Sequence, residues 1–151
     1  MAKSLNIEPG NKEFKMSKGI PPVQKYMTYV PKSIGFDRPL QQALDLMREM
    51  RVRHLPVLKA GKLVGILTDR DLNLVLQFQD VDPNTMTIEE AYTPDPYFTA
   101  PSAPLNEVAA LMAEKKYGCA LVVDNDKLVG IFTEVDALRA LADVLETRLK
   151  H

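Results

Sequence analysis

The sequence is poor in the residues that most often carry catalysis or bind metals. It has one cysteine, Cys119, two histidines, His54 and His151, and no tryptophan. A single cysteine excludes an intramolecular disulfide and agrees with the reducing cytoplasm, where we expect the protein to be. No His-x-x-x-His, Cys-x-x-Cys or EF-hand pattern occurs. We therefore predict no catalytic residue, no built-in metal site and no obligatory cofactor, although ATP could bring a magnesium ion with it.

A strong net charge and long apolar runs are also missing. The formal net charge of -1 and the pI of about 6.1 give no broad positive field for nucleic acid. Apolar residues nowhere run on for the length of a membrane-spanning helix, and the N-terminal segment lacks the apolar core of a signal peptide. We expect neither a membrane nor a nucleic-acid partner. The hydrophobic content of 46% is enough for a core.

The sequence does contain an internal repeat. The phrase GKLVGILTDRDL at 61–72 is echoed by KLVGIFTEVDAL at 127–138, and the match holds at a constant shift of 65 residues. Further upstream the same shift pairs identical residues without a gap: Thr28 with Thr93, Pro39 with Pro104, and Met47 with Met112. Two copies of one unit therefore span about residues 21–80 and 86–148. Residues 1–20, rich in Lys, Ser, Gly and Asn, are expected to be a flexible lead-in.

Within each copy the spacing of the apolar residues changes in the same order. Helical spacing comes first, from Leu40 and from Leu105, with Asp37 and Ser102 as the expected N-caps. A short β-rich run follows, LPVL or ALVV, then a polar turn and a second strand, LVGIL or LVGIF. Helical spacing returns after the Thr of each repeated phrase. Each unit is predicted to be strand or extended segment, helix, strand, strand, helix.

A unit of this size cannot bury the apolar face of its own small sheet, and a second copy supplies the missing cover. We therefore predict an α/β (α+β) fold in which two units of β-α-β-β-α type pack sheet to sheet about a pseudo-twofold axis. Such packing leaves crevices that occur in pairs.

The repeated phrases resemble a known family. LPVLKAGKLVGILTDRDL and ALVVDNDKLVGIFTEVDAL, each with G-x-x-T-x-x-D, are similar to the corresponding parts of a tandem pair of CBS domains, called a Bateman module. The preceding segments MTYVPKSIGFDRPLQQAL and YTPDPYFTAPSAPLNEVA extend the resemblance to about residues 21–148. The resemblance implies a regulatory module without catalysis. Its clefts would hold an adenosine compound such as AMP, ADP, ATP, S-adenosylmethionine or a dinucleotide.

The closing Thr-x-x-Asp of each phrase has two interpretations. A Thr followed three residues later by an acid is a capping box, which satisfies free amides at a helix start. The same carboxylate could instead accept hydrogen bonds from both ribose hydroxyls, and the Thr hydroxyl and helix amides suit a phosphate. In the family this Asp is the usual ribose binder. The resemblance thus implies ligand contacts for Thr68 and Asp71 in one cleft and for Thr133 and Asp136 in the other.

The residues just before the LPVL and ALVV strands differ between the copies. The first copy has Arg-Val-Arg-His where the second has Lys-Tyr-Gly-Cys. In related modules these positions reach the ligand's phosphates, and a guanidinium suits that contact. The resemblance therefore implies that Arg53 and His54, with Arg70 from the next helix, join Asp71 in a phosphate-binding cleft. The alternative is a solvated turn with exposed positive charge.

The second cleft is expected to be poorer in charge. Gly118 and Cys119 occupy its matching places, so we expect it to bind phosphates weakly and to hold an uncharged adenosyl group or nothing. Cys119 is also interpreted as a small buried hydrophobe. For the adenine side the resemblance suggests five residues: Thr28, Thr93, Val52, Tyr117 and Tyr97. Tyr97 could stack on a base or simply pack.

Two functions of different classes remain open. The first is an adenosine-nucleotide sensor that signals to an unknown partner protein. The second is a structural or dimerisation module with empty clefts, suggested by an apolar stripe on the last helix: Val135, Leu138, Leu141, Ala142, Leu145 and Leu149. Both predict a homodimer that meets through its helices. A small enzyme, the third alternative, would depend on His54 or Cys119.

Overall fold

The computed structural model describes residues 19–29 and 32–149, with side chains as far as Thr147. The predicted lead-in at 1–20 therefore lies outside the described residues, except for its last two positions, and so does the side chain of Leu149. No helix in the described parts is both long enough and apolar enough to cross a bilayer.

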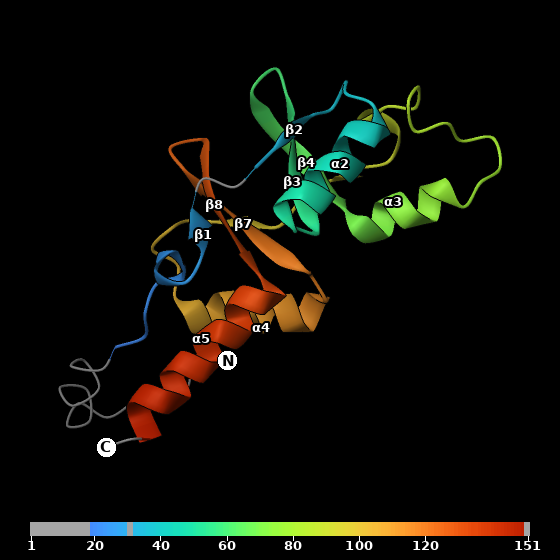
Figure 1. Ribbon diagram of the computed structural model, residues 1–151. Coiled ribbons are helices and arrows are strands. Elements are labelled where there is room, and N and C mark those ends of the chain that lie inside the picture. Colours follow the sequence, from blue (N-terminus) through green and yellow to red (C-terminus); the bar gives the residue numbers. More distant parts are fainter. Residues whose placement is uncertain (1–18, 30–31, 150–151) are drawn as a thin grey trace.

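The chain forms two copies of one arrangement, and Figure 1 shows the strands lying between two pairs of helices. The elements of the first copy are η1 (Val23–Lys25), β1 (Thr28–Tyr29), β2 (Ile34–Gly35), α2 (Leu40–Met50), β3 (His54–Lys59), β4 (Lys62–Thr68) and α3 (Asp69–Leu76). Those of the second copy are η2 (Ile88–Glu90), β5 (Thr93–Pro94), β6 (Phe98–Thr99), α4 (Leu105–Lys115), β7 (Cys119–Asp124), β8 (Lys127–Thr133) and α5 (Glu134–Leu149). The predicted order of helices and hairpins is confirmed, with two short strands before each first helix where one was expected.

The first strand of each copy belongs to the sheet of the other copy, an exchange that the sequence did not predict. One sheet has the order β1-β8-β7-β6 and the other β2-β3-β4-β5. Thr28 of β1 lies opposite Ile131 of β8, and Thr93 of β5 lies opposite Ile66 of β4, both in antiparallel pairs. The two copies are therefore joined by backbone hydrogen bonds as well as by side-chain packing.

The glycine of each LVGI phrase allows this exchange. A Cβ on Gly130 would lie 2.9 Å from the carbonyl oxygen of Thr28 and still closer to the sulfur of Met27. A Cβ on Gly65 would collide with the carbonyl oxygen of Thr93 and with the ring of Tyr92. Packed interiors have no room for such overlap, so these two positions need the missing side chain.

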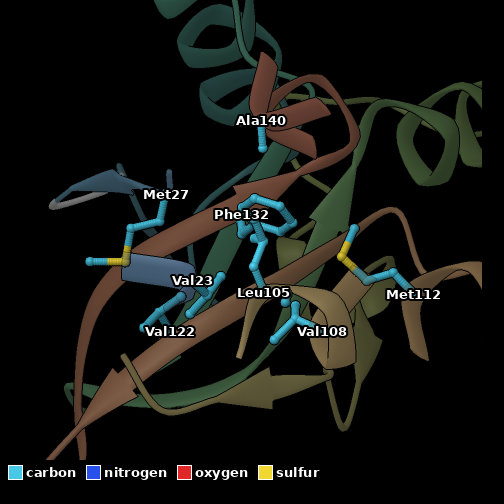
Figure 2. Packing of buried hydrophobic residues seen from close by; sticks show 9 residues of the cluster. Val23, Met27, Leu105, Val108, Met112, Val122, Phe132 and Ala140 are labelled. Atoms are coloured by element: carbon cyan, nitrogen blue, oxygen red, sulfur yellow. The ribbon is translucent and has the colours of Figure 1, made fainter. Parts of the chain in front are cut away.

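Each sheet packs one face against the helices of its own half. Figure 2 shows the core of the second half, where the ring of Phe132 from β8 lies among Leu105 and Val108 of α4 and Ala140 of α5. Phe132 and Leu105 are 0% and 9% exposed, so burial of large apolar side chains stabilises this half directly. A matching core lies between the other sheet and helices α2 and α3.

The two sheets meet through their hairpins. A separate buried cluster joins Ile66 of β4 to Cys119, Leu121 and Ile131 of β7 and β8, with Leu63 and Leu128 packed against it. Its members come from both copies, which confirms the predicted packing of sheet against sheet.

Helices α2 and α4 begin without the side-chain caps predicted at Asp37 and Ser102, so that prediction is wrong. A proline occupies the N-cap position of each, and neither helix start has a side-chain cap. Instead the first amide of α2 donates to the carbonyl of Met86 over 2.8 Å, and that of α4 to the carbonyl of Pro21 over 2.9 Å. Both carbonyls come from the segment that leads into the other copy, so long-range contacts replace the local caps.

Candidate functional site

Both Thr-x-x-Asp phrases form capping boxes at helix starts, as one interpretation predicted. The amide of Thr68 donates to Oδ2 of Asp71 over 3.0 Å, and the amide of Asp71 donates to Oγ1 of Thr68 over 3.0 Å. The corresponding distances for Thr133 and Asp136 are 2.9 and 3.3 Å. Only Oδ2 of each carboxylate is needed for its helix.

The two carboxylates differ in burial, although both face the opposite copy. Asp136 is 4% exposed, and its Oδ1 lies 3.5 Å from Oγ1 of Thr28 and 3.4 Å from Nη1 of Arg139. Asp71 is half-buried and accepts a 3.4 Å contact from Thr93. Since Thr28 and Thr93 belong to the exchanged strands, each Asp lies where the two copies meet. A buried carboxylate of this kind needs charged or donor groups around it.

A cleft of about 500 Å³ opens beside Asp136, a size suited to a small-molecule ligand. Its walls come from both copies. The first copy contributes Thr28, Tyr29, Lys32, Met50, Arg51, Val52, Arg53 and His54. The second contributes Ile131, Thr133, Glu134, Val135, Asp136 and Arg139. We call this the Asp136 cleft.

Arg53 and His54 line the Asp136 cleft, whereas the sequence analysis grouped them with Asp71. His54 also lies near enough to Asp71 for that carboxylate to act on its pKa. The start of β3 faces the start of α5 across the contact between the copies. A Cβ on Gly118 would lie only 3.0 Å from Nε2 of His54, so the imidazole lies against the other copy. The guanidinium of Arg53 is largely exposed and reaches 4.0 Å from the carboxylate of Asp69, a weak surface pair.

Positive charge is concentrated in the Asp136 cleft. Four side chains that are cationic at neutral pH line it, against two carboxylates: Lys32, Arg51, Arg53 and Arg139 against Glu134 and Asp136. The expectation that this cleft is poor in charge assumed that Gly118 and Cys119 line it, and neither does. The premise is wrong because Arg53 and His54 of the first copy, and not Gly118 and Cys119 of the second, line the cleft beside Asp136.

His54 and Cys119 occupy matching positions, and both are affected by burial. Burial lowers the pKa of His54 below its ordinary value, against the opposing effect of the carboxylates of Asp69 and Glu134. Burial also raises the pKa of the Cys119 thiol to about 12, so the thiol stays protonated. The interpretation of Cys119 as a small buried hydrophobe is confirmed.

The five adenine-side candidates do not gather in one place. Thr28 and Val52 line the Asp136 cleft, while Thr93 contacts Asp71. The rings of Tyr97 and Tyr117 stack on each other, with centroids 5.2 Å apart and an angle of 26° between their planes. Arg70 lies exposed on the first turn of α3.

Sequence reasoning missed five polar or aromatic residues of the cleft: Tyr29, Lys32, Arg51, Glu134 and Arg139. A signal existed for Arg139, which follows Asp136 by three residues on one helix face and pairs with it. Tyr29, Lys32 and Arg51 reach the cleft through the exchange of β1 and the meeting of the two copies, which no local pattern reveals.

The apolar stripe predicted on the last helix is exposed where its side chains are described. Val135, Leu138, Leu141 and Leu145 of α5 are 55%, 65%, 54% and 47% exposed. Leu141 also lines an almost wholly apolar groove of about 290 Å³ between α4 and α5. In the described part of the chain, no group of three or more His, Cys, Asp and Glu side chains could hold a metal ion.

Comparison with known proteins places this geometry in context. The sequence model of the CBS domain matches residues 23–77 and 86–143, the two copies described above. Hypoxic response protein 1 of Mycobacterium tuberculosis is 32% identical over 111 residues, which cover 73% of this chain and 78% of that protein. A solved structure of a hypoxic response protein I, with 30% identity and a TM-score of 0.69 over 78% of this chain and 97% of that one, holds two coordinated zinc ions.

Two similar solved structures contain adenosine compounds. The CBS domain pair of protein MJ0100, in complex with 5'-methylthioadenosine and S-adenosyl-L-methionine, has a TM-score of 0.74 and 28% identity, covering 83% of this chain and 98% of that one. CBSX2, a protein of Arabidopsis thaliana solved with AMP, has a TM-score of 0.73 and 27% identity, covering 82% and 98%.

Proposed function

This chain belongs to the CBS domain family, and we propose that it is a regulatory module that binds an adenosine nucleotide in the Asp136 cleft. The observation that carries the proposal is the cleft itself, where a buried carboxylate and a set of cations from both copies surround about 500 Å³. The ligands of MJ0100 and CBSX2 support an adenosine compound.

Asp136 is the proposed ribose binder. Its Oδ2 is held by the amide of Thr133 at 2.9 Å, which fixes the carboxylate at the helix start. Its Oδ1 has only longer contacts, 3.5 Å to Thr28 and 3.4 Å to Arg139. Ribose hydroxyls could replace these with shorter hydrogen bonds, because a carboxylate oxygen accepts more than one.

The cations of the cleft support a phosphate-bearing ligand. Lys32, Arg51 and Arg53 lie on the first-copy wall, opposite the start of α5. Guanidinium and ammonium groups both bind phosphate oxygens. S-adenosylmethionine carries a positive sulfonium, which these cations disfavour, so we propose AMP, ADP or ATP.

The base is proposed to lie on the apolar and aromatic part of the wall. Tyr29, Met50 and Val52 line the cleft from the first copy. Tyr29 is 62% exposed, so one face of its ring is free to stack on an adenine.

Binding would change how the two copies sit against each other. The proposed ribose contact is on the second copy, and the proposed phosphate and base contacts are on the first. A ligand that bridges both favours the arrangement in which they are closest, and a partner protein that distinguishes the arrangements receives the signal. No chemical step on the ligand is proposed.

Helix α5 is the proposed route of the signal. Its first turns carry Asp136 and Arg139 to the ligand, and its exposed face carries the apolar stripe of Val135, Leu138, Leu141 and Leu145. We propose that two copies of the chain meet along this stripe as a homodimer in the cytoplasm. The stripe also favours the second candidate function, a dimerisation module with empty clefts.

A thermal-shift assay with AMP, ADP, ATP and S-adenosylmethionine separates the two functions. At a ligand concentration of 100 times Kd, binding stabilises the folded state by about 2.7 kcal/mol, or roughly 5–10 °C in Tm. The shift should disappear in Asp136→Asn, which keeps an amide oxygen for the helix cap but lacks the charge. Indifference of the wild-type protein to all four compounds would leave dimerisation as its function.

A further inference from the structure

We propose that each chain holds one nucleotide, in the Asp136 cleft, because on the Asp71 side Tyr117, stacked on Tyr97, fills the place that Val52 leaves open for the base. This inference rests on the proposed function and specifies which of the two related sites is used.

The correspondence between the two sides follows from the repeat. The 65-residue shift matches Lys32 with Tyr97 and Val52 with Tyr117. The strands obey the same shift, since Ile34 lies opposite Val57 in one parallel pair and Thr99 opposite Val122 in the other. The tyrosines therefore occupy the positions at which Lys32 and Val52 line the Asp136 cleft.

The tyrosine pair is anchored in the fold. The amide of Leu121 donates to the carbonyl of Tyr97 over 2.9 Å, which attaches this residue to β7. Tyr97 is half-buried and packs against the core of the second half. Tyr117 stacks on it at 5.2 Å between centroids, the separation expected of an aromatic pair. An adenine on this side would have to separate the two rings.

Polar groups are also lost on the Asp71 side. Arg53, His54 and Arg139 of the Asp136 cleft correspond to Gly118, Cys119 and Leu74. Tyr29, the exposed aromatic, corresponds to Pro94. Lys116 and Arg70 remain as cations there, so charge alone does not exclude a phosphate. The decisive difference is the place of the base.

Calorimetric titration of the full chain with AMP measures the number of sites. We expect one AMP per chain, which is lost in Asp136→Asn and retained within about twofold in Kd in Asp71→Asn. The two variants are matched, because each alters the capping box of one copy in the same way. Two AMP per chain, or binding that depends on Asp71 and survives Asp136→Asn, would overturn the inference while leaving a nucleotide-binding module. No binding of AMP, ADP or ATP would overturn the proposed function itself.

Replacing Tyr117 tests the cause. Tyr117→Val introduces the residue found at the matching position of the Asp136 cleft, Val52. Because Tyr117 is 39% exposed, its truncation removes little of the core. The number of bound AMP should rise from one toward two, while Tyr117→Phe, which keeps the stacked ring, should stay at one. A folded Tyr117→Val protein, with its circular dichroism and Tm retained, that still binds one AMP would refute the role of the tyrosine pair.

Discussion

Gly130→Ala tests whether the exchange of the first strands holds the module together. The new Cβ would lie 2.9 Å from the carbonyl oxygen of Thr28, whereas ordinary contact begins at 3.4 Å, so β1 must move by about half an ångström. The sulfur of Met27 lies closer still, and Met27 is 7% exposed, so its side chain cannot swing into solvent.

The expected cost follows from these contacts. Overpacking of this kind destabilises the folded state by about 1–3 kcal/mol. Alanine also lowers the conformational entropy of the unfolded chain, which offsets about 0.4–1 kcal/mol of this loss. The free energy of unfolding should therefore fall by about 1–2 kcal/mol, with a drop of roughly 2–8 °C in Tm. AMP binding should weaken too, because β1 carries Thr28 and Tyr29 into the cleft.

Urea denaturation followed by circular dichroism measures this change. Gly35→Ala is the matched control, because its Cβ would lie 3.0 Å from the tip of the exposed Asp37 side chain, which can rotate away, and at an ordinary 3.6 Å from Cγ of Arg38. We expect the control to lie within about 0.5 kcal/mol of the wild-type protein. Equal stability of Gly130→Ala and Gly35→Ala would show that β1 does not rest on β8 as described.

Three further predictions concern single residues. Arg51 and Lys116 both end a helix in the left-handed region, at φ 56° and 60°. Arg51→Gly and Lys116→Gly should therefore each keep the free energy of unfolding or raise it by up to about 1 kcal/mol. Only Arg51→Gly should weaken AMP binding, by about tenfold in calorimetry. An equal loss of affinity in both variants would place the phosphates elsewhere. Because burial lowers the pKa of His54 below 6.5, the unfolded chain takes up this proton first, and the free energy of unfolding should fall as the pH drops from 6.5 toward the folded pKa. Urea midpoints at pH 7.5 and 5.5 should therefore differ less in His54→Asn, and an unchanged difference would contradict the burial of the imidazole. Since burial raises the pKa of Cys119 to about 12, native protein at pH 8 should react with a disulfide reagent far more slowly than protein in denaturant, and equal rates would show an open thiol.

The sequence by itself determined the elements and their duplication. The change from helical to alternating spacing, the polar turns and the two Thr-x-x-Asp phrases act within a few residues of each other, so they could be identified without the structure. The capping boxes at Asp71 and Asp136 are of this kind, and both formed as predicted. The resemblance to CBS domains depended on the same local phrases.

Only the tertiary structure decided which residues share a cleft. Arg53 and His54 stand in the same copy as Asp71, and order along the chain suggested that they act together. A twofold contact instead brings the start of one copy's strand to the start of the other copy's helix, and the exchanged strands carry Thr28 to Asp136. Such contacts depend on buried surfaces that are far apart in the chain. Because the two copies have similar local sequences, no local pattern shows whether a residue faces its own copy or the other one.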